Sequence, residues 1–489
     1  MFNFLALFVL VVYVTTSFSI ADDFETEFSR LINVNSDQEH QVYGSSGSNE
    51  EHTVFFPQKL DHFKSTARNL WDQRSIVLNT HYKKNGPFFV YLFGNKPASI
   101  EWLRNSRIMS YAKDAQALVI GLEHRYYGDS RPFANTSLEN LNYLDVQQAL
   151  ADIAYFIRTV NEISLVPENT KWVLFGGFYG GSLAAWARLR YPHLVYGAVA
   201  SGALMSIKSE YPEYLESVRN SYFSFNYTCA KNIKSAFQQI EDLLQTQEGR
   251  TKISQQFRLC GSLESNEEDK AIFRGILSEQ IALAVERNHR SYDESMSSIC
   301  YIMNRDSDSA LENLKTVSSR FLPRGYCWYT KETSIVSAYQ KVHYDSREQS
   351  DRLWQYQLCT QLGLNLPSTK SSDMFGQYKP EAESLAKYCQ DIFGPEYNQQ
   401  TIDEGVKEME LEFGGSAFNT NRLAFIYGSQ DPWRGAGITE KVKNALYDVV
   451  NIKGASHLAD LESSRKDADL ENGIQEIKDI LKSWLQPQT

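Results

Sequence analysis

Residues 171–183 contain a tight glycine-rich turn of the kind that presents a nucleophile, but the nucleophile's position holds an aromatic residue. The apolar run at 172–175 predicts a strand, and residues 182–191 are rich in helix formers, so the glycines between them lie in a strand-to-helix turn. In a G-x-S-x-G turn, a strained backbone lifts the central side chain above the sheet. Here the centre of 176–180 is Phe178. Its benzyl side chain cannot attack a carbonyl carbon.

Two further residues have the types and the order that complete a hydrolytic triad. Asp431 follows the apolar run 422–427, and His457 follows a run that ends at Ile452. In α/β-hydrolases the nucleophile, the acid and the histidine come in this order, with the last two on loops after late strands. The carboxylate fixes the imidazole tautomer, and the imidazole takes the nucleophile's proton and later returns it. Alone, an Asp-Pro turn or a single histidine has an ordinary structural explanation, but the order and the placement favour a catalytic origin.

The elements needed to hold these residues alternate along the chain. Strand-like runs occur at 88–93, 117–122, 172–175, 197–201, 422–427 and 446–452, and helix-like runs at 99–113, 146–160 and 470–485. This alternation predicts a mostly parallel sheet covered by helices on both faces. The segment 206–405 differs, because it is charged, helix-like and contains all six cysteines. We therefore expect an α/β-hydrolase core from 53–205 and 406–489, with a helical cap at 206–405.

The N-terminal residues predict targeting and processing. Residues 1–21 combine an apolar stretch with the small residues Ser19 and Ala21, which predicts a cleaved signal peptide. The alternative is a membrane anchor, for which the apolar part is short. Residues 22–52 are polar and acidic and predict a flexible leader or propeptide. After signal cleavage no membrane span is predicted.

Composition and cysteine spacing narrow the class of partner. The net charge of −11 argues against nucleic acid or an anionic membrane surface as the main partner, since both favour a basic face. The six cysteines are an even set without the close pairs of a zinc site, so we expect disulfides, no metal and no cofactor. Sequons at Asn135 and Asn226 predict N-glycosylation of a secreted chain.

The span from about 53 to 485 resembles the family of prolyl carboxypeptidase, dipeptidyl peptidase II and thymus-specific serine peptidase. The matching stretches beside the turn are QKLDHF (58–63), WDQR (71–74), EHRYYG (123–128), YLDVQQALAD (143–152), QLC (357–359) and DPW (431–433). The resemblance implies a secreted or lysosomal/endosomal α/β-hydrolase with a helical cap. It also implies a serine-type exopeptidase that cleaves after proline or a small residue near a peptide terminus, with a peptide or protein as its ligand; a homodimer stays open.

The same resemblance assigns roles to individual positions. Asp431 and His457 match the family's acid and base, and Phe178 occupies its serine position. The backbone N–H of Tyr179 and the loop containing Gly94 match the oxyanion site. The cap disulfides of the family imply the pairs Cys229–Cys300, Cys260–Cys327 and Cys359–Cys389.

Departures from the family pattern gather around one pocket. The loop at 93–97 reads FGNKP where the family usually has a Gly-Gly-Glu-Gly or Gly-Asn-Glu-Gly loop. Its acid can receive a substrate's amine, which Lys96 would repel, and Pro97 has no backbone N–H to donate. Residues 200–204 read ASGAL where the family prefers Ser-Ser-Ala-Pro. These changes favour altered function over a single accidental substitution.

Three hypotheses follow for the function. The first is an inactive homologue that binds peptides or regulates an active relative. The second is an active serine exopeptidase whose printed sequence carries a variant at Phe178, and the third is a purely structural role. A substitute nucleophile is not expected, because Ser182 lies one helical turn beyond the apex and faces the wrong side of it.

Overall fold

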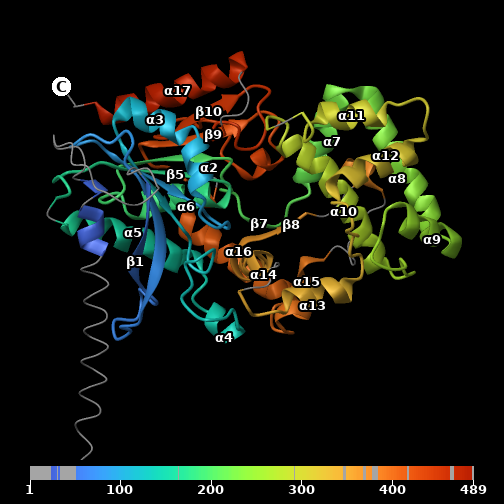
Figure 1. Ribbon diagram of the computed structural model, residues 1–489, viewed down its shortest axis with the longest axis horizontal. Coiled ribbons are helices and arrows are strands. Elements are labelled where there is room, and N and C mark those ends of the chain that lie inside the picture. Colours follow the sequence, from blue (N-terminus) through green and yellow to red (C-terminus); the bar gives the residue numbers. More distant parts are fainter. Residues whose placement is uncertain are drawn as a thin grey trace, which may run out of the picture.

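An eight-stranded, mostly parallel sheet forms the centre of the molecule (Figure 1). The computed structural model describes residues 24–29, 31–32, 51–163, 165–290, 292–344, 349–366, 370–376, 384–415, 418–462 and 467–486. The sheet order is β1-β2-β4-β3-β5-β6-β9-β10, in which β1 and β2 are antiparallel to their neighbours and all other pairs are parallel. The strands are β1 Glu51–Lys59, β2 Leu70–Leu78, β3 Phe88–Leu92, β4 Leu118–Leu122, β5 Trp172–Gly177, β6 Gly197–Ser201, β9 Leu423–Gly428 and β10 Asp448–Ile452.

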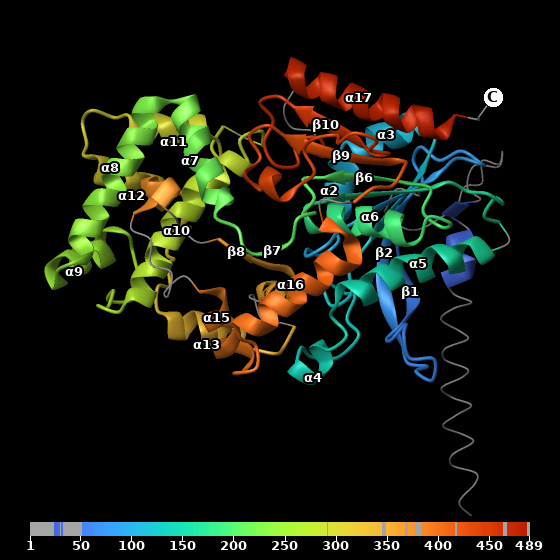
Figure 2. The same ribbon diagram turned by 180° about the vertical axis from the view of Figure 1, so that it is seen from behind.

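Helices cover both faces of this sheet, which confirms the predicted fold class. One face is covered by α5 (Val146–Glu162) and α6 (Tyr179–Arg190), and the other by α2 (Ile100–Asn105), α3 (Ile108–Ala115) and α17 (Ala468–Leu485), as Figures 1 and 2 show. Alternate residues of each strand point to opposite faces. In β3, accordingly, Phe88, Val90 and Leu92 join the cluster under α5 and α6, whereas Phe89 and Tyr91 join the cluster under α3 and α17.

The helix predicted at 99–113 is interrupted. It forms α2 and α3, with Ser106 between them in an extended conformation. The Ser106 hydroxyl donates to the carbonyl of Leu103 at 2.7 Å. A serine side chain that satisfies the backbone in this way competes with helix continuation, and this explains the break.

The prediction of an unpacked leader at 22–52 is wrong for its first part. Residues 24–29 are helical, and the side chains of Phe24 and Phe28 are buried. Phe24 packs edge-on against Phe56 of β1, with ring centroids 5.1 Å apart. Two aromatic side chains four residues apart lie on one face of a helix, a local pattern that the polar composition of the segment concealed. Strand β1 begins at Glu51, while residues 33–50 and the predicted signal at 1–21 lie outside the described residues.

The chain between β6 and β9 forms the predicted helical insertion. Its first helices make a lobe beside the core, and α13 and α15 lie below that lobe in the view of Figure 1. The short strands β7 (Lys208–Glu210) and β8 (Gly363–Asn365) pair in parallel where the insertion meets the core. The helices are α7 Glu213–Phe225, α8 Tyr227–Leu244, α9 Gln247–Gln256, α10 Glu267–Glu286, α11 Met296–Met303, α12 Ala310–Phe321, α13 Glu332–Tyr339, α14 Gln349–Gln357, α15 Leu385–Phe393 and α16 Gln399–Phe413.

The last of these helices belongs partly to the core. The ring of Phe413 in α16 stacks on Trp186 of α6, with centroids 4.7 Å apart. The predicted boundary between residues 405 and 406 therefore falls inside a continuous helix that connects the insertion to the sheet's covering layer.

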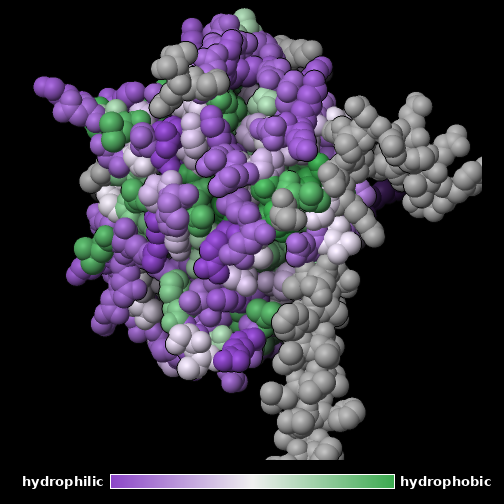
Figure 3. Space-filling view, turned by 90° about the vertical axis from the view of Figure 1, so that its left-hand side faces the viewer, coloured by the Kyte–Doolittle hydropathy of each residue, from purple (hydrophilic) through white to green (hydrophobic). Residues whose placement is uncertain are grey.

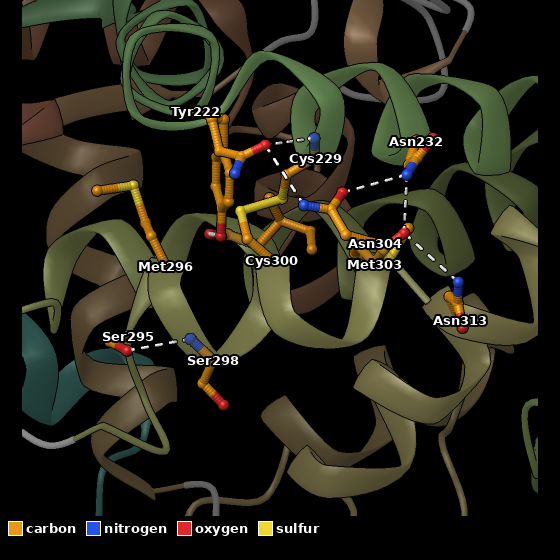
Figure 4. Close-up of a disulfide and its surroundings, with 12 residues drawn as sticks. Tyr222, Cys229, Asn232, Ser295, Met296, Ser298, Cys300, Met303, Asn304 and Asn313 are labelled. Atoms are coloured by element: carbon orange, nitrogen blue, oxygen red, sulfur yellow. Dashed lines mark hydrogen bonds between the residues drawn. A yellow bond between two sulfur atoms is a disulfide. The ribbon is translucent and has the colours of Figure 1, made fainter. Parts of the chain in front are cut away.

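Three disulfides staple the insertion, and their predicted pairing is confirmed. Cys229 bonds to Cys300, Cys260 to Cys327, and Cys359 to Cys389. Figure 4 shows the first, which joins α8 to α11. Beside it, the side-chain amides of Asn232 and Asn313 donate to the carbonyl of Met303 at 2.9 and 3.4 Å. Covalent and polar links thus hold α8, α11 and α12 together.

The end of the core opposite the cap has a mostly hydrophilic surface with small separated apolar areas (Figure 3). None of the helices among the described residues combines the length and the apolar character needed to cross a bilayer.

Candidate active site

The turn after β5 has the backbone geometry of a nucleophile elbow. Phe178 lies between the end of β5 and the start of α6, with φ 53° and ψ −121°. This positive φ is strained for a residue with a side chain. A Cβ on Gly176 would lie 2.0 Å from the carbonyl oxygen of Gly180, so the tightness of the turn requires glycine there. The backbone turn that presents a side chain above the sheet is therefore retained, although the side chain at its apex is a benzyl group.

Asp431 and His457 meet at the same edge of the sheet as the elbow. They follow β9 and β10, which are parallel to β5, so the carboxyl ends of all three strands lie at one edge of the sheet, with β6 between β5 and β9. His457 Nδ1 lies 2.8 Å from Asp431 Oδ2, and the other Asp431 oxygen accepts from the N–H of Trp433 at 2.8 Å. Asp431 is fully buried. The structure therefore brings together the two residues that the sequence predicted as acid and base.

The environment of His457 favours its protonated form. Burial alone would lower the pKa of the imidazole, but the Asp431 carboxylate, with a smaller contribution from Glu286, raises the pKa above its ordinary value. Gly202 makes room for the ring, because a Cβ there would lie 2.8 Å from His457 Cε1. Within the described part of the chain, the hydrogen bond to Asp431 is the one that orients this imidazole.

The ring of Phe178 occupies the space in front of that imidazole. It meets His457 edge to face, with centroids 5.6 Å apart and planes at 83°. On its other sides it contacts Trp433 at 4.9 Å and Trp354 at 6.0 Å. The benzyl group is therefore held by aromatic neighbours from the core and the insertion.

The two predicted oxyanion residues lie next to each other at the elbow. A Cβ on Gly94 would lie 2.8 Å from the N of Gly180 and 3.5 Å from the side chain of Tyr179. Gly94 also has a positive φ of 62°, which glycine adopts without strain. The loop after β3 thus approaches the first turn of α6 closely. The catalytic use of these two backbone positions stays a prediction.

A buried polar network contacts the elbow residue Tyr179, and sequence reasoning assigned this network no role. The hydroxyl of Tyr179 lies 3.1 Å from His124 Nε2 and accepts from the Gln357 amide at 2.9 Å. Tyr127 donates to the same glutamine at 2.7 Å. Burial lowers the pKa of His124 to about 4, so the ring is neutral. The stretches 123–128 and 357–359, which match the family, contain His124, Tyr127 and Gln357. Their match to the family could have indicated that the two stretches belong to one site.

A second buried cluster fixes the loop that carries His124. Arg125 makes a bidentate ion pair with Asp152 at 2.6 and 2.7 Å, and His62 contacts the same carboxylate at 2.8 Å. Both partners of the ion pair are fully buried or nearly so. Two parallel hydrogen bonds of this kind fix the relative orientation of the two side chains. They hold the loop that follows β4 against α5.

The side chain of Ser182 has a structural role. Its hydroxyl donates to the carbonyl of Leu204 at 2.8 Å and accepts from the N–H of the same residue at 3.0 Å. The side chain is fully buried. It cannot reach a substrate in this arrangement, as the sequence predicted.

A cavity of about 940 Å³ lies beside Phe178 between the core and the insertion. Its walls include Trp433 and His457 from the core and Tyr214, Glu279 and Trp354 from the insertion. The divergent loop residues Lys96 and Pro97 also line it. The cleft has therefore not collapsed onto the benzyl ring, and the ring forms part of its wall.

The sheet order, the elbow and the cap define an α/β-hydrolase. Within that class, the chain belongs to the family described as serine carboxypeptidase S28, whose model matches residues 58–475.

Relatives of this family match most of the chain. A Caenorhabditis elegans protein, K12H4.7, whose name proposes a serine protease, is 32% identical over 88% of this chain and 87% of its own length. Human lysosomal Pro-X carboxypeptidase is 28% identical, covering 83% and 82%. Mouse thymus-specific serine protease is 27% identical, covering 88% and 86%. Among solved structures, proline iminopeptidase from Mycobacterium smegmatis has a TM-score of 0.36 at 11% identity, covering 88% of this chain and 97% of that one.

Proposed function

We propose that this chain is a catalytically silent serine-peptidase homologue that binds peptides in the cavity beneath its cap. Asp431 and His457 are the remaining acid and base of the triad, and Phe178 replaces the serine. Loss of the nucleophile from such a triad lowers turnover about a million-fold. Peptide binding agrees with the names of the relatives, which describe a carboxypeptidase and proteases.

The observation that carries this proposal is the contact between the Phe178 ring and the His457 imidazole, with centroids 5.6 Å apart. A working nucleophile has to lie within hydrogen-bond reach of the base, about 3 Å. In this proposal the Phe178 ring takes the place of a nucleophile beside the imidazole. The cavity of about 940 Å³ beside it is nevertheless large enough for several peptide residues.

The proposal includes passage through the secretory pathway, to the outside of the cell or to a lysosome or endosome. Three disulfides form and persist in an oxidising compartment. The Asn226 side-chain oxygen caps α8 by accepting from the N–H of Cys229 at 2.9 Å, and this leaves its nitrogen for a glycan. Glycosylation of Asn135 belongs to the same proposal.

The first test restores the nucleophile. The secreted wild-type chain, Phe178→Ser, and Phe178→Ser combined with His457→Ala are incubated with a panel of proline-containing peptides, and products are followed by mass spectrometry. We expect no cleavage by wild type and measurable cleavage by Phe178→Ser. We expect the added His457→Ala change to remove that activity, because the base would be absent.

The same experiment tests the alternative of an active serine exopeptidase. Cleavage by wild type that His457→Ala abolishes would contradict the proposal and require another nucleophile. An inactive Phe178→Ser variant that folds like wild type would show that the changes at Lys96 and Pro97 also disable the site.

A further inference from the structure

The first described segment of the chain, residues 24–29 and 31–32, is an amphipathic helix, which we call the leader helix. Its exposed side chains include those of residues 25–27. Four apolar side chains of the segment are buried: Phe24, Phe28, Leu31 and Ile32. Spacings of three and four residues place these apolar side chains on one face of the helix. That face is the one turned toward the core.

The leader helix packs against β1, α5 and the start of β3. The ring centroid of Phe24 lies 5.1 Å from that of Phe56 in β1 and 6.4 Å from that of Phe156 in α5. The ring of Phe28 lies 6.4 Å from that of Phe88, the first residue of β3. Such distances are typical of aromatic pairs in a protein core. The leader helix therefore belongs to the apolar layer beneath α5 and α6.

A buried hydrogen bond fixes the end of the leader helix. The side-chain amide of Asn79, which follows β2 and is 6% exposed, donates to the carbonyl of Leu31 at 3.0 Å. We call the contacted residues Phe56, Phe88, Phe156 and Asn79 the leader site. Without the leader helix, the amide of Asn79 would lose this acceptor, and the three rings would lose part of their cover from water. Both changes are unfavourable for the folded core.

The leader site lies at the opposite edge of the sheet from the candidate active site. Phe88 pairs with Trp172, the first residue of β5, whereas Phe178 follows the last residue of the same strand. A strand of six residues spans about 20 Å. Figure 1 shows the leader helix in dark blue at the end of the core away from the cap. None of its described residues lines the cavity beside Phe178, so it does not obstruct the cleft as an inhibitory pro-segment would.

We propose that the leader helix is retained in the mature protein and that the leader site is its permanent binding site. Removal of the predicted signal peptide leaves the helix in place. A later cut between residues 33 and 50 leaves it bound to the core without a covalent link. Its role is to stabilise the amino edge of the sheet. This inference goes beyond the proposed peptide binding and does not depend on it.

The test cuts the folded chain behind the leader helix. A recognition sequence for a site-specific protease is inserted between residues 45 and 46 of the full chain, and the purified protein is cleaved and passed through a gel-filtration column in native buffer. We expect mass spectrometry to find the leader fragment in the same peak as the core, and denaturant to release it. Release of the fragment in native buffer would overturn the proposal. So would a purified wild-type protein that begins after residue 32 and has no leader fragment bound to it.

Two variants with the same new side chain test the leader site itself. Phe28→Asp places a carboxylate against the aromatic rings, so we expect the cut fragment to dissociate and the melting temperature to fall by about 5 °C or more. Thr26→Asp adds the same charge at an exposed position of the same helix and should behave like wild type. A Phe28→Asp protein with the melting temperature of wild type would contradict the proposal. Since the wild-type chain folds before it is cut, its result decides the proposal even where Phe28→Asp fails to fold.

Discussion

Asp460 is a buried acid whose proton has consequences for stability. It lies three residues after the histidine of the site and is 3% exposed. One oxygen accepts from the hydroxyl of Ser201, and the other has no hydrogen-bond partner among the described residues. Burial raises the pKa of Asp460 to about 7. A carboxyl of the unfolded chain titrates near 3.9, so the folded state binds the proton more tightly.

We predict that this group makes the protein more stable in acid than at neutral pH. Its contribution is complete below the unfolded pKa and disappears as pH rises through about 7. Between pH 8 and pH 5 the gain in unfolding free energy is about 2 to 3 kcal/mol. Asp460→Asn is neutral at every pH and should remove this part of the pH dependence.

The measurement is urea unfolding of wild type and Asp460→Asn at pH 5 and pH 8. Other titrating groups, His457 among them, contribute to both proteins, so the difference between the two pH profiles isolates the aspartate. Parallel profiles would show that Asp460 is ionised in the folded protein. A protein that functions in an acidic compartment would be stabilised there by the predicted pH dependence.

At the scale of elements, the end of α10 is fastened to the loop that carries the candidate base. His289 contacts the hydroxyl of Ser456, and its Nε2 lies 2.8 Å from Glu462. Arg290 reaches the other oxygen of Glu462 at 2.6 Å. Ser456 directly precedes His457 in the chain. This junction couples the position of the cap to that of the imidazole.

We predict that His289→Ala loosens the cap over the cavity. The change removes one buried and one partly buried hydrogen bond, each worth about 1 kcal/mol, and leaves the Ser456 hydroxyl without its His289 partner. Hydrogen exchange should accelerate in the last turns of α10 and in the loop 453–462. Tyr301→Ala is a control on the exposed surface of the cap, where the ring is 68% exposed. Unchanged exchange in both segments would show that other contacts hold the cap.

Some strands could be predicted from the sequence, and others could not. The strands β3, β5 and β9 are continuous apolar runs, because both faces of a central strand are covered, and they were predicted within a few residues. The hairpin of β1 and β2 was missed. Its buried positions include Gln58 and Gln73, whose side-chain amides bond to each other at 2.9 Å. Each amide also donates to a carbonyl elsewhere in the core, Gln58 to Asp152 and Gln73 to Glu123. Buried polar residues of this kind interrupt the apolar alternation that would have indicated the strands.

The same distinction applies to the site. The proximity of Phe178, Asp431 and His457 was predictable because each belongs to a short local motif and their order follows the strands. The part of the cavity wall that the cap contributes was not predictable. Tyr214 and Glu279 lie on helices whose docking depends on the packing of the whole insertion. Their positions relative to Phe178 come from tertiary contacts that no local spacing encodes.

At the scale of the whole molecule, the cap and the core are stabilised by different means. All six cysteines lie between Cys229 and Cys389, so every disulfide closes a loop inside the insertion and none joins it to the sheet. The Cys229–Cys300 and Cys260–Cys327 bonds span 71 and 67 residues. Closing loops of this length stabilises a fold by about 4 kcal/mol in the chain-entropy model. The sheet depends instead on its two apolar layers, one of which continues into the insertion.

We therefore predict that reduction of the disulfides affects the cap first. In mild reductant, amides of α8, α11 and α12 should lose protection from hydrogen exchange, while amides of β3, β5 and β6 remain protected. Peptide binding should be lost in parallel, because Tyr214, Glu279 and Trp354 reach the cavity from the insertion. Simultaneous loss of protection in the cap and the central strands would contradict this prediction and show that the two parts unfold as one cooperative unit. Retained binding in the reduced protein would mean that the core wall alone holds the peptide.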